Sequence, residues 1–238
     1  MPVGSWCTQY RQTTVSNMQP WTRYTTAGPA GASRPENFVE LGPAHTDGLD
    51  RKLLGEVNGL RVLELGSGAG RSSIALARQG ARVVAVDPDE IEVERVRMAA
   101  DVAEVHVEVH HGDLAELAFL PADSFDAVIA IHSLAATNDI ARVFRQTHRL
   151  LRTDRPMVMT LPHPAAMIVN PDEPKSIVRQ YGVGEPLGEN EYLTYPHTIG
   201  EVFTQFTRAN FRIDTMIEPI GDEQIPNSLI FRARKTGN

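Results

Sequence analysis

Residues 62–70, which read VLELGSGAG, constrain the fold of this chain more than any other stretch of the sequence. Residues 61–65 form a short apolar run, typical of a strand that is buried on both faces of a parallel sheet. Glycines follow at positions 66, 68 and 70, and residues 71–78 have the pattern of a helix. Glycine adopts positive φ readily and lets a ligand approach the backbone. We therefore expect a ligand cradle, in which the free amide N–H groups of the helix start favour a carboxylate or a phosphate.

The chain around this turn alternates between apolar runs and helical patterns. Such alternation predicts an α/β fold, in which helices cover both faces of a parallel sheet and the crossovers are right-handed. A short helix at residues 49–57, with Asp47 or Thr46 as its cap, is expected before the turn. After the turn we expect strands at residues 81–86, 105–110, 125–131 and 156–161, and helices at residues 89–100 and 138–151.

The C-terminal part of the sequence predicts a different connection. Thr198 and Glu201 have the spacing of a capping box at the start of a helix, and Asn210 can end that helix in left-handed geometry. Two apolar runs follow, at residues 211–217 and 228–233. Their connector is too short for a parallel crossover, so this last pair of strands is expected to be antiparallel.

Two segments fall outside the regular pattern. Residues 1–36 are rich in Thr, Ser, Gln, Gly and Pro and predict an irregular N-terminal arm, whose aromatic residues pack on the body or form a lid. Residues 162–197 contain several prolines and glycines with little periodicity. Because so long an insertion is commonly functional, we expect a substrate-side insertion or lid within a domain spanning residues 37–238.

The charge and cysteine content restrict the partners of the chain. A formal net charge of −7 disfavours nucleic acid or an anionic membrane surface as the main partner. A small-molecule partner is therefore expected, for a monomer or a homodimer. Cys7 is the single cysteine, which fits a reducing compartment, and no signal peptide or long apolar run is evident. These features predict a cytoplasmic protein.

The spacing of the glycines separates two classes of cofactor. A dinucleotide site has the pattern G-x-G-x-x-G, whereas residues 66–70 read G-x-G-x-G, so the third glycine comes one position early. The pattern closely resembles that of the class I S-adenosylmethionine-dependent methyltransferases, in which an acidic residue and an apolar residue precede G-x-G-x-G. Glu64, Leu65 and the three glycines match it. The resemblance extends over residues 45–235 and implies a Rossmann-like, doubly wound sheet of seven strands, mostly parallel with the last strand antiparallel.

The resemblance also implies roles for individual residues in binding S-adenosylmethionine. Asp87, at the end of the second strand, would accept hydrogen bonds from both ribose hydroxyls, which suits a carboxylate. Asp113 and the backbone N–H of Leu114 would hold the adenine. Glu64 would organise the methionine end, or would be a buried ion-pair partner, and Ser67 would donate to the cofactor or only shape the turn. The other expected cofactor contacts are Gly66, Gly68, Gly70, Pro88, Ile131 and His132.

The acceptor side is less defined by the sequence. Ligands of such sheets bind beyond the C-terminal ends of the strands, and a histidine there could act as a base near neutral pH. The candidates are His132, His163, His45, His197 and Tyr195. His110, His111 and Asp113 are close in sequence, but the two histidines would point to opposite sides of a strand, so no metal site is expected.

These features together predict a methyltransferase that transfers a methyl group to an oxygen, nitrogen or carbon nucleophile of a small molecule. Two alternatives remain at this point. The first is a regulatory module that binds S-adenosylmethionine without turnover, and the second is an NAD(P)-dependent oxidoreductase, for which the glycine spacing is wrong.

Overall fold

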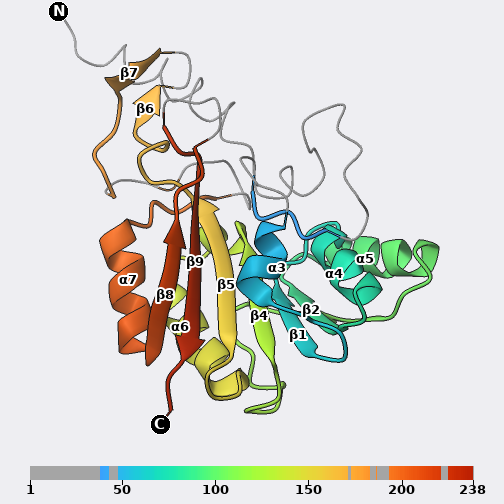
Figure 1. Cartoon of the computed structure of the whole chain (residues 1–238). Coiled ribbons are helices and arrows are strands. Elements are labelled where there is room, and N and C mark those ends of the chain that lie inside the picture. The colour runs from blue at the N-terminus through green and yellow to red at the C-terminus, as the bar shows by residue number, and fades with distance from the viewer. Residues whose placement is uncertain are drawn as a thin grey trace, which may run out of the picture.

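A seven-stranded mixed sheet forms the centre of the protein, with the strand order β3-β2-β1-β4-β5-β9-β8 (Figure 1). The computed structural model describes residues 38–42, 48–170, 173–182, 186, 193–220 and 225–237, so the predicted arm and His45 lie outside the described residues. Strand β9 is antiparallel to both of its neighbours, and the other described pairs of this sheet are parallel. The predicted fold class is confirmed. The strands are β1 Arg61–Leu65, β2 Arg82–Asp87, β3 Val107–His111, β4 Ala127–Ile131, β5 Pro156–Pro162, β8 Phe211–Ile217 and β9 Ser228–Lys235.

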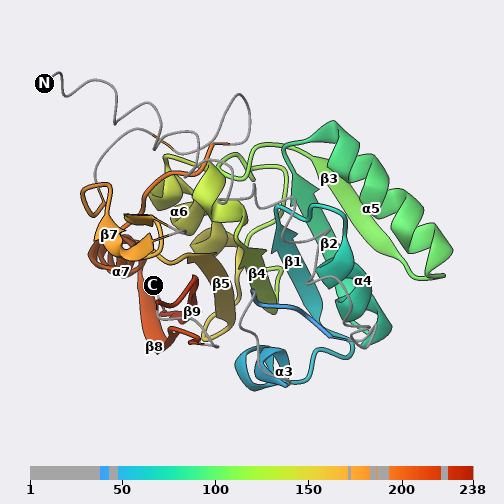
Figure 2. The same ribbon diagram turned by 90° about the horizontal axis from the view of Figure 1, so that it is seen from above.

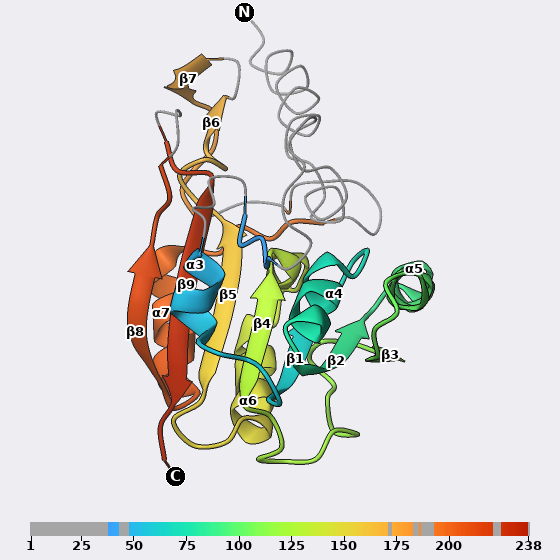
Figure 3. The same ribbon diagram turned by 45° about the vertical axis from the view of Figure 1, so that its right-hand side comes forward.

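Helices pack on both faces of the sheet, and a separate apolar cluster fills the space under each layer. Residues of α6 and α7 share one cluster with side chains of β1, β4, β5 and β9, whereas residues of α3 and α4 share the other (Figure 3). The sheet is therefore a middle layer, as a strand buried on both faces requires. None of the described helices is long and apolar enough to cross a membrane. The helices are α3 Leu49–Leu54, α4 Arg71–Arg78, α5 Glu90–Val102, the short 3₁₀ helix η1 Ser133–Ala136, α6 Ile140–Leu150 and α7 Ile199–Arg208.

The predicted elements are present, with differences at their ends. The first predicted helix, residues 49–57, ends earlier because Gly55 takes a φ of 78° that leaves the helical region. Thr198 caps α7 by accepting the N–H of Glu201, and Asn210 has a φ of 58°, as the sequence predicts. Within residues 162–197 the structure contains a two-stranded hairpin, β6 Val169–Asn170 and β7 Glu173–Ile177, which the irregular sequence pattern did not predict.

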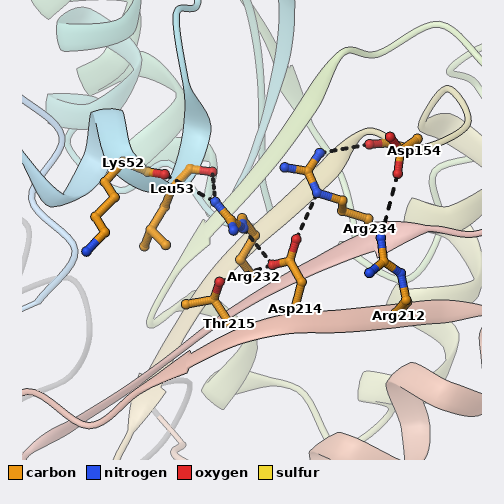
Figure 4. A network of polar contacts seen from close by, with 8 residues as sticks. All are labelled: Lys52, Leu53, Asp154, Arg212, Asp214, Thr215, Arg232 and Arg234. Atoms are coloured by element: carbon orange, nitrogen blue, oxygen red, sulfur yellow. Dashed lines mark hydrogen bonds and ion pairs between the residues drawn. The ribbon is translucent and has the colours of Figure 1, made fainter.

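A polar network attaches α3 to the antiparallel end of the sheet (Figure 4). The register of β8 against β9 shifts at Asp214, and the Asp214 carboxylate accepts hydrogen bonds from Nε of Arg232 (2.6 Å) and Nε of Arg234 (2.8 Å). Arg232 also donates from Nη1 to the carbonyls of Lys52 (3.1 Å) and Leu53 (3.4 Å), near the C-terminus of α3. The guanidinium therefore satisfies carbonyls that a helix end leaves without partners.

Candidate cofactor site

The glycine turn lies between the end of β1 and the start of α4, at the C-terminal edge of the sheet viewed from above in Figure 2. Gly66, Gly68 and Gly70 have φ values of 74°, 48° and 79°, which explains the requirement for glycine at this turn. The N–H groups of the three glycines donate to Val86 O (2.7 Å), Asp87 Oδ2 (2.9 Å) and Ser67 O (2.9 Å), respectively. The N–H groups of the three glycines are therefore already paired within the protein.

Close packing is a second reason for two of the glycines. A Cβ at Gly66 would overlap the side chain of Ser133, the first residue of η1. A Cβ at Gly70 would lie 3.1 Å from both methyl groups of Val96 on α5. The hydroxyl of Ser133 in turn donates to the carbonyl of Leu65. The turn is thus fixed between the loop after β4 and helix α5.

Asp87 connects the end of β2 to the glycine turn. Its side chain is fully buried, and Oδ2 accepts the Gly68 N–H while Oδ1 accepts the N–H of Asp89 (2.9 Å). The hydroxyl of Ser67 lies 3.4 Å from Oδ2, which favours the alternative that Ser67 shapes the turn. Burial raises the pKa of Asp87, although the hydrogen bonds from Asp89 and Gly68 partly oppose this effect. The carboxylate is therefore held rigidly beside the turn, where the resemblance implies ribose binding.

The Glu64 carboxyl group lies against the N-terminal end of α4, in the interior of the protein. Its carboxyl is 2% exposed and accepts hydrogen bonds from the hydroxyls of Ser72 and Ser73 and from the Ser73 N–H. Burial raises its pKa to about 8; the Ser73 and Ser72 hydrogen bonds partly oppose this rise, and the charge of Asp87 adds to it. The sequence reasoning gave these two serines no role, although they lie two and three residues after the last glycine of the motif, which is a usable signal.

The donor groups described above are thus already paired, two of them with backbone carbonyls and the others with the carboxyl groups of Asp87 and Glu64. A phosphate at this position would meet Asp87 and Glu64 at amides that a dinucleotide site leaves for its ligand. Hydroxyl groups and a cationic centre are compatible with the same two carboxyls. S-adenosylmethionine carries ribose hydroxyls and a positively charged sulfur, so the residues of the turn fit it better than they fit a dinucleotide.

The residues expected at the adenine lie around the end of β3. Asp113 is exposed and its Oδ1 accepts the N–H of Ala115 (2.8 Å), whereas the neighbouring Leu114 is buried. Nε2 of His111 lies 3.0 Å from the carbonyl of Pro88, which links β3 to the end of β2. Asp113, Leu114 and Pro88 therefore stand beside Asp87, at one side of the turn. Their contact with a cofactor remains a prediction.

His132 and His163 follow β4 and β5, as expected, but both are buried. His132 has a φ of 58°, and its Nε2 lies 3.3 Å from the hydroxyl of Ser228. Burial lowers its pKa to about 4, so the ring is neutral at pH 7. Nδ1 of His163 accepts the N–H of Ala165 (3.1 Å), which leaves the proton on Nε2, 2.8 Å from Glu218 Oε1. Both rings are thus held by the protein.

His197 and Tyr195 lie beside η1, on the segment that returns from the insertion. The N–H of Tyr195 donates to the carbonyl of Ala135 (2.8 Å). Nε2 of His197 lies 2.9 Å from the carbonyl of Thr137, and its Nδ1 is 3.6 Å from Glu201 Oε1. The structure therefore brings this segment to η1 and Thr137, which follow β4 in the chain. Within the described ranges, no group of three His, Cys, Asp or Glu side chains is arranged to hold a metal ion.

Known proteins resemble this chain in sequence and in fold. The family described as "Methyltransferase domain" matches residues 62–154. The ubiquinone biosynthesis O-methyltransferase of Azorhizobium caulinodans is 32% identical over 113 residues, which are 48% of this chain and 44% of that relative. The magnesium-protoporphyrin O-methyltransferase of Rhodobacter capsulatus is 31% identical over 153 residues, covering 63% of this chain and 66% of that relative.

A solved structure extends the similarity beyond the matched sequence. An S-adenosylmethionine dependent methyltransferase from Mesorhizobium loti superimposes with a TM-score of 0.67 and 26% identity, covering 78% of this chain and 95% of that one. The present chain spans about half to two thirds of the length of the curated relatives it matches. The glycine turn, the strand order and these similarities together show that the chain belongs to the class I S-adenosylmethionine-dependent methyltransferases.

Proposed function

We propose that this protein is a methyltransferase that uses S-adenosylmethionine and methylates a small molecule. The observation that carries the proposal is the occupation of the cradle amides by Asp87 and by the chain's own carbonyls, with Glu64 at the start of α4. This arrangement disfavours a phosphate and therefore the oxidoreductase alternative. It supports a ligand that offers hydroxyls and a positive charge.

Each part of the described site has a function in this proposal. S-adenosylmethionine, when bound, supplies an activated methyl group on a positively charged sulfur. Asp87 would hold the ribose, and Asp113 with Leu114 would hold the adenine. Ile131, at the end of β4, would contact the cofactor. The acceptor must then lie in line with the methyl group, because proximity and orientation account for much of the rate in such a transfer.

An oxygen nucleophile is the acceptor group that the relatives support. Two of them are named O-methyltransferases, one of ubiquinone biosynthesis and one of magnesium-protoporphyrin. A hydroxyl acceptor loses a proton on methylation, so a base is useful. His197 remains a described candidate for this role. His163 would first have to release the Ala165 N–H from its Nδ1, and the low pKa of His132 makes it a weak base at pH 7. A cytoplasmic location is also proposed, since the single cysteine allows no intrachain disulfide.

Parallel calorimetric titrations test the cofactor first. The purified protein is titrated with S-adenosylmethionine, S-adenosylhomocysteine and NAD. We expect the first two ligands to bind and NAD not to bind. Transfer of labelled methyl from S-adenosylmethionine to a panel of phenols, carboxylic acids, amines and thiols then tests the activity. Binding of NAD alone would overturn the proposal, and cofactor binding without transfer to any acceptor class would favour the non-catalytic alternative.

A further inference from the structure

An ion pair stands next to the cradle and is not explained by the roles above. Arg71 is the first residue of α4 and directly follows Gly70. Its Nη2 lies 3.6 Å from Oε2 of Glu40, and about half of the Arg71 side chain is exposed. Glu40 belongs to the segment of residues 38–42, which precedes the domain core in sequence. The contact therefore joins this segment to the start of the helix that carries the turn.

The segment of residues 38–42 is anchored at several points along the C-terminal edge of the sheet. The N–H of Val39 donates to Oδ2 of Asp50 on α3 (3.1 Å), and Val39 and Leu41 are fully buried. A Cβ at Gly42 would lie 3.1 Å from Nε2 of His132, so the segment runs close to the loop after β4. In Figure 2 the segment crosses beside β4 towards α4. The backbone is therefore held in place before and after Glu40, and this places the Glu40 side chain against Arg71.

One group of the cofactor is not accounted for by the cradle contacts described above. S-adenosylmethionine carries a carboxylate at its methionine end. The three glycine amides already have acceptors, and Glu64 occupies the N–H of Ser73 at the helix start. A further carboxylate near the Asp87 carboxylate needs a cation, because like charges at close range repel. Arg71 is the cationic side chain that directly adjoins the turn.

Resting on the proposed function, we propose that Arg71 binds the carboxylate of the cofactor and that Glu40 occupies Arg71 until the cofactor displaces it. A guanidinium pairs with either carboxylate through the same donors. The exchange breaks one ion pair and forms another, so the net charge at Arg71 stays balanced. Glu40 is then an internal competitor, and cofactor binding releases its side chain from Arg71, whereas the buried side chains of Val39 and Leu41 keep the segment in place.

The test compares two ligands that differ only in the carboxylate. Affinities for S-adenosylmethionine and for decarboxylated S-adenosylmethionine are measured by calorimetry in the wild type and in Arg71→Gln. We expect Arg71→Gln to lower the affinity for S-adenosylmethionine roughly 10- to 100-fold, as for the loss of a charge-assisted hydrogen-bonded pair, without lowering the affinity for the decarboxylated ligand. Arg71→Lys should retain part of the affinity. Arg78→Gln, at the other end of α4, is the matched control and should change neither affinity.

Glu40→Gln tests the competition separately. Removing the competing carboxylate should raise the affinity for S-adenosylmethionine several-fold and should leave the affinity for the decarboxylated ligand unchanged. Equal weakening of both ligands by Arg71→Gln would overturn the assignment of Arg71. No gain in Glu40→Gln would overturn the exchange. If the wild type bound neither ligand, the proposed function itself would fail, which distinguishes that failure from the failure of this inference.

Discussion

Replacing Glu64 by glutamine should change how the stability of the protein depends on pH. In the folded protein, burial raises the pKa of Glu64 from 4.5 to about 8, an effect that the charge of Asp87 strengthens. Glutamine has nearly the same shape as the protonated side chain but does not ionise. It can still accept hydrogen bonds from Ser72 and Ser73, so the variant should fold.

The sign and size of the effect follow from proton binding. Below pH 4.5 the Glu64 carboxyl is protonated in both the folded and the unfolded states. Between pH 4.5 and about pH 8 the folded protein keeps a proton that the unfolded chain has released, so the free energy of unfolding falls as the pH rises. One pKa unit corresponds to about 1.4 kcal/mol, which gives an upper limit of about 5 kcal/mol. Local relaxation reduces this limit, and we expect a loss of about 2–4 kcal/mol.

Urea denaturation followed by circular dichroism measures this loss. Unfolding curves are recorded between pH 5 and pH 8.5 for the wild type, for Glu64→Gln and for Glu56→Gln, an exposed control. The stability of Glu64→Gln relative to the wild type should rise by about 2–4 kcal/mol across this range, whereas the control should follow the wild type. Parallel pH profiles for the wild type and Glu64→Gln would refute the reasoning and would mean that Glu64 ionises normally in the folded protein.

Three further variants test the site and the fold. Asp87→Asn should lower the affinity for S-adenosylmethionine, measured by calorimetry, at least about tenfold, because a charged acceptor is lost and one buried N–H loses its partner. An unchanged affinity would contradict the ribose assignment. Gly66→Ala should lower the free energy of unfolding by about 2–4 kcal/mol, since the new methyl group overlaps Ser133 at a φ of 74°, and combining it with Ser133→Gly should restore part of this loss. Burial opposes ionisation of Asp214, but hydrogen bonds from Arg232 and Arg234 outweigh it and lower its pKa. Asp214→Asn should therefore cost about 1 kcal/mol at pH 7, and a difference from the wild type that persisted in acid would contradict this account.

The parts of the fold that the sequence predicted depend on local patterns. The run before Gly66, the cap at Thr198 and the left-handed Asn210 each follow from the preferences of a few neighbouring residues. The predicted end of the first helix, at residue 57, was wrong by three residues, because Gly55 leaves the helical region with a φ of 78°. The hairpin at β6 and β7 could not be predicted, since pairing of such short strands depends on contacts rather than on periodicity.

The candidate site was predicted as residue types but not as a hydrogen-bond arrangement. The positions of Asp87 and Asp113 at neighbouring strand ends follow from a parallel sheet whose order is predictable. The pairing of Asp87 with the Gly68 N–H, and of Glu64 with Ser73, joins segments that the linear pattern does not relate. The burial of His132 and His163 was also not evident, because a histidine after a strand can lie in solvent or in the interior.

The sequence alone therefore determined the fold class, the position of the glycine turn and the acidic residues around it, because each depends on the order and spacing of nearby residues. The tertiary structure decided which groups of the turn remain for a ligand. Asp87 and Glu64 fill donors that the motif would otherwise offer to an anion, and Glu40 reaches Arg71 from a segment 31 positions earlier. Burial sets the pKa values of Glu64 and His132. These properties arise from the dielectric surroundings and partners that distant segments provide, so only the folded chain defines them.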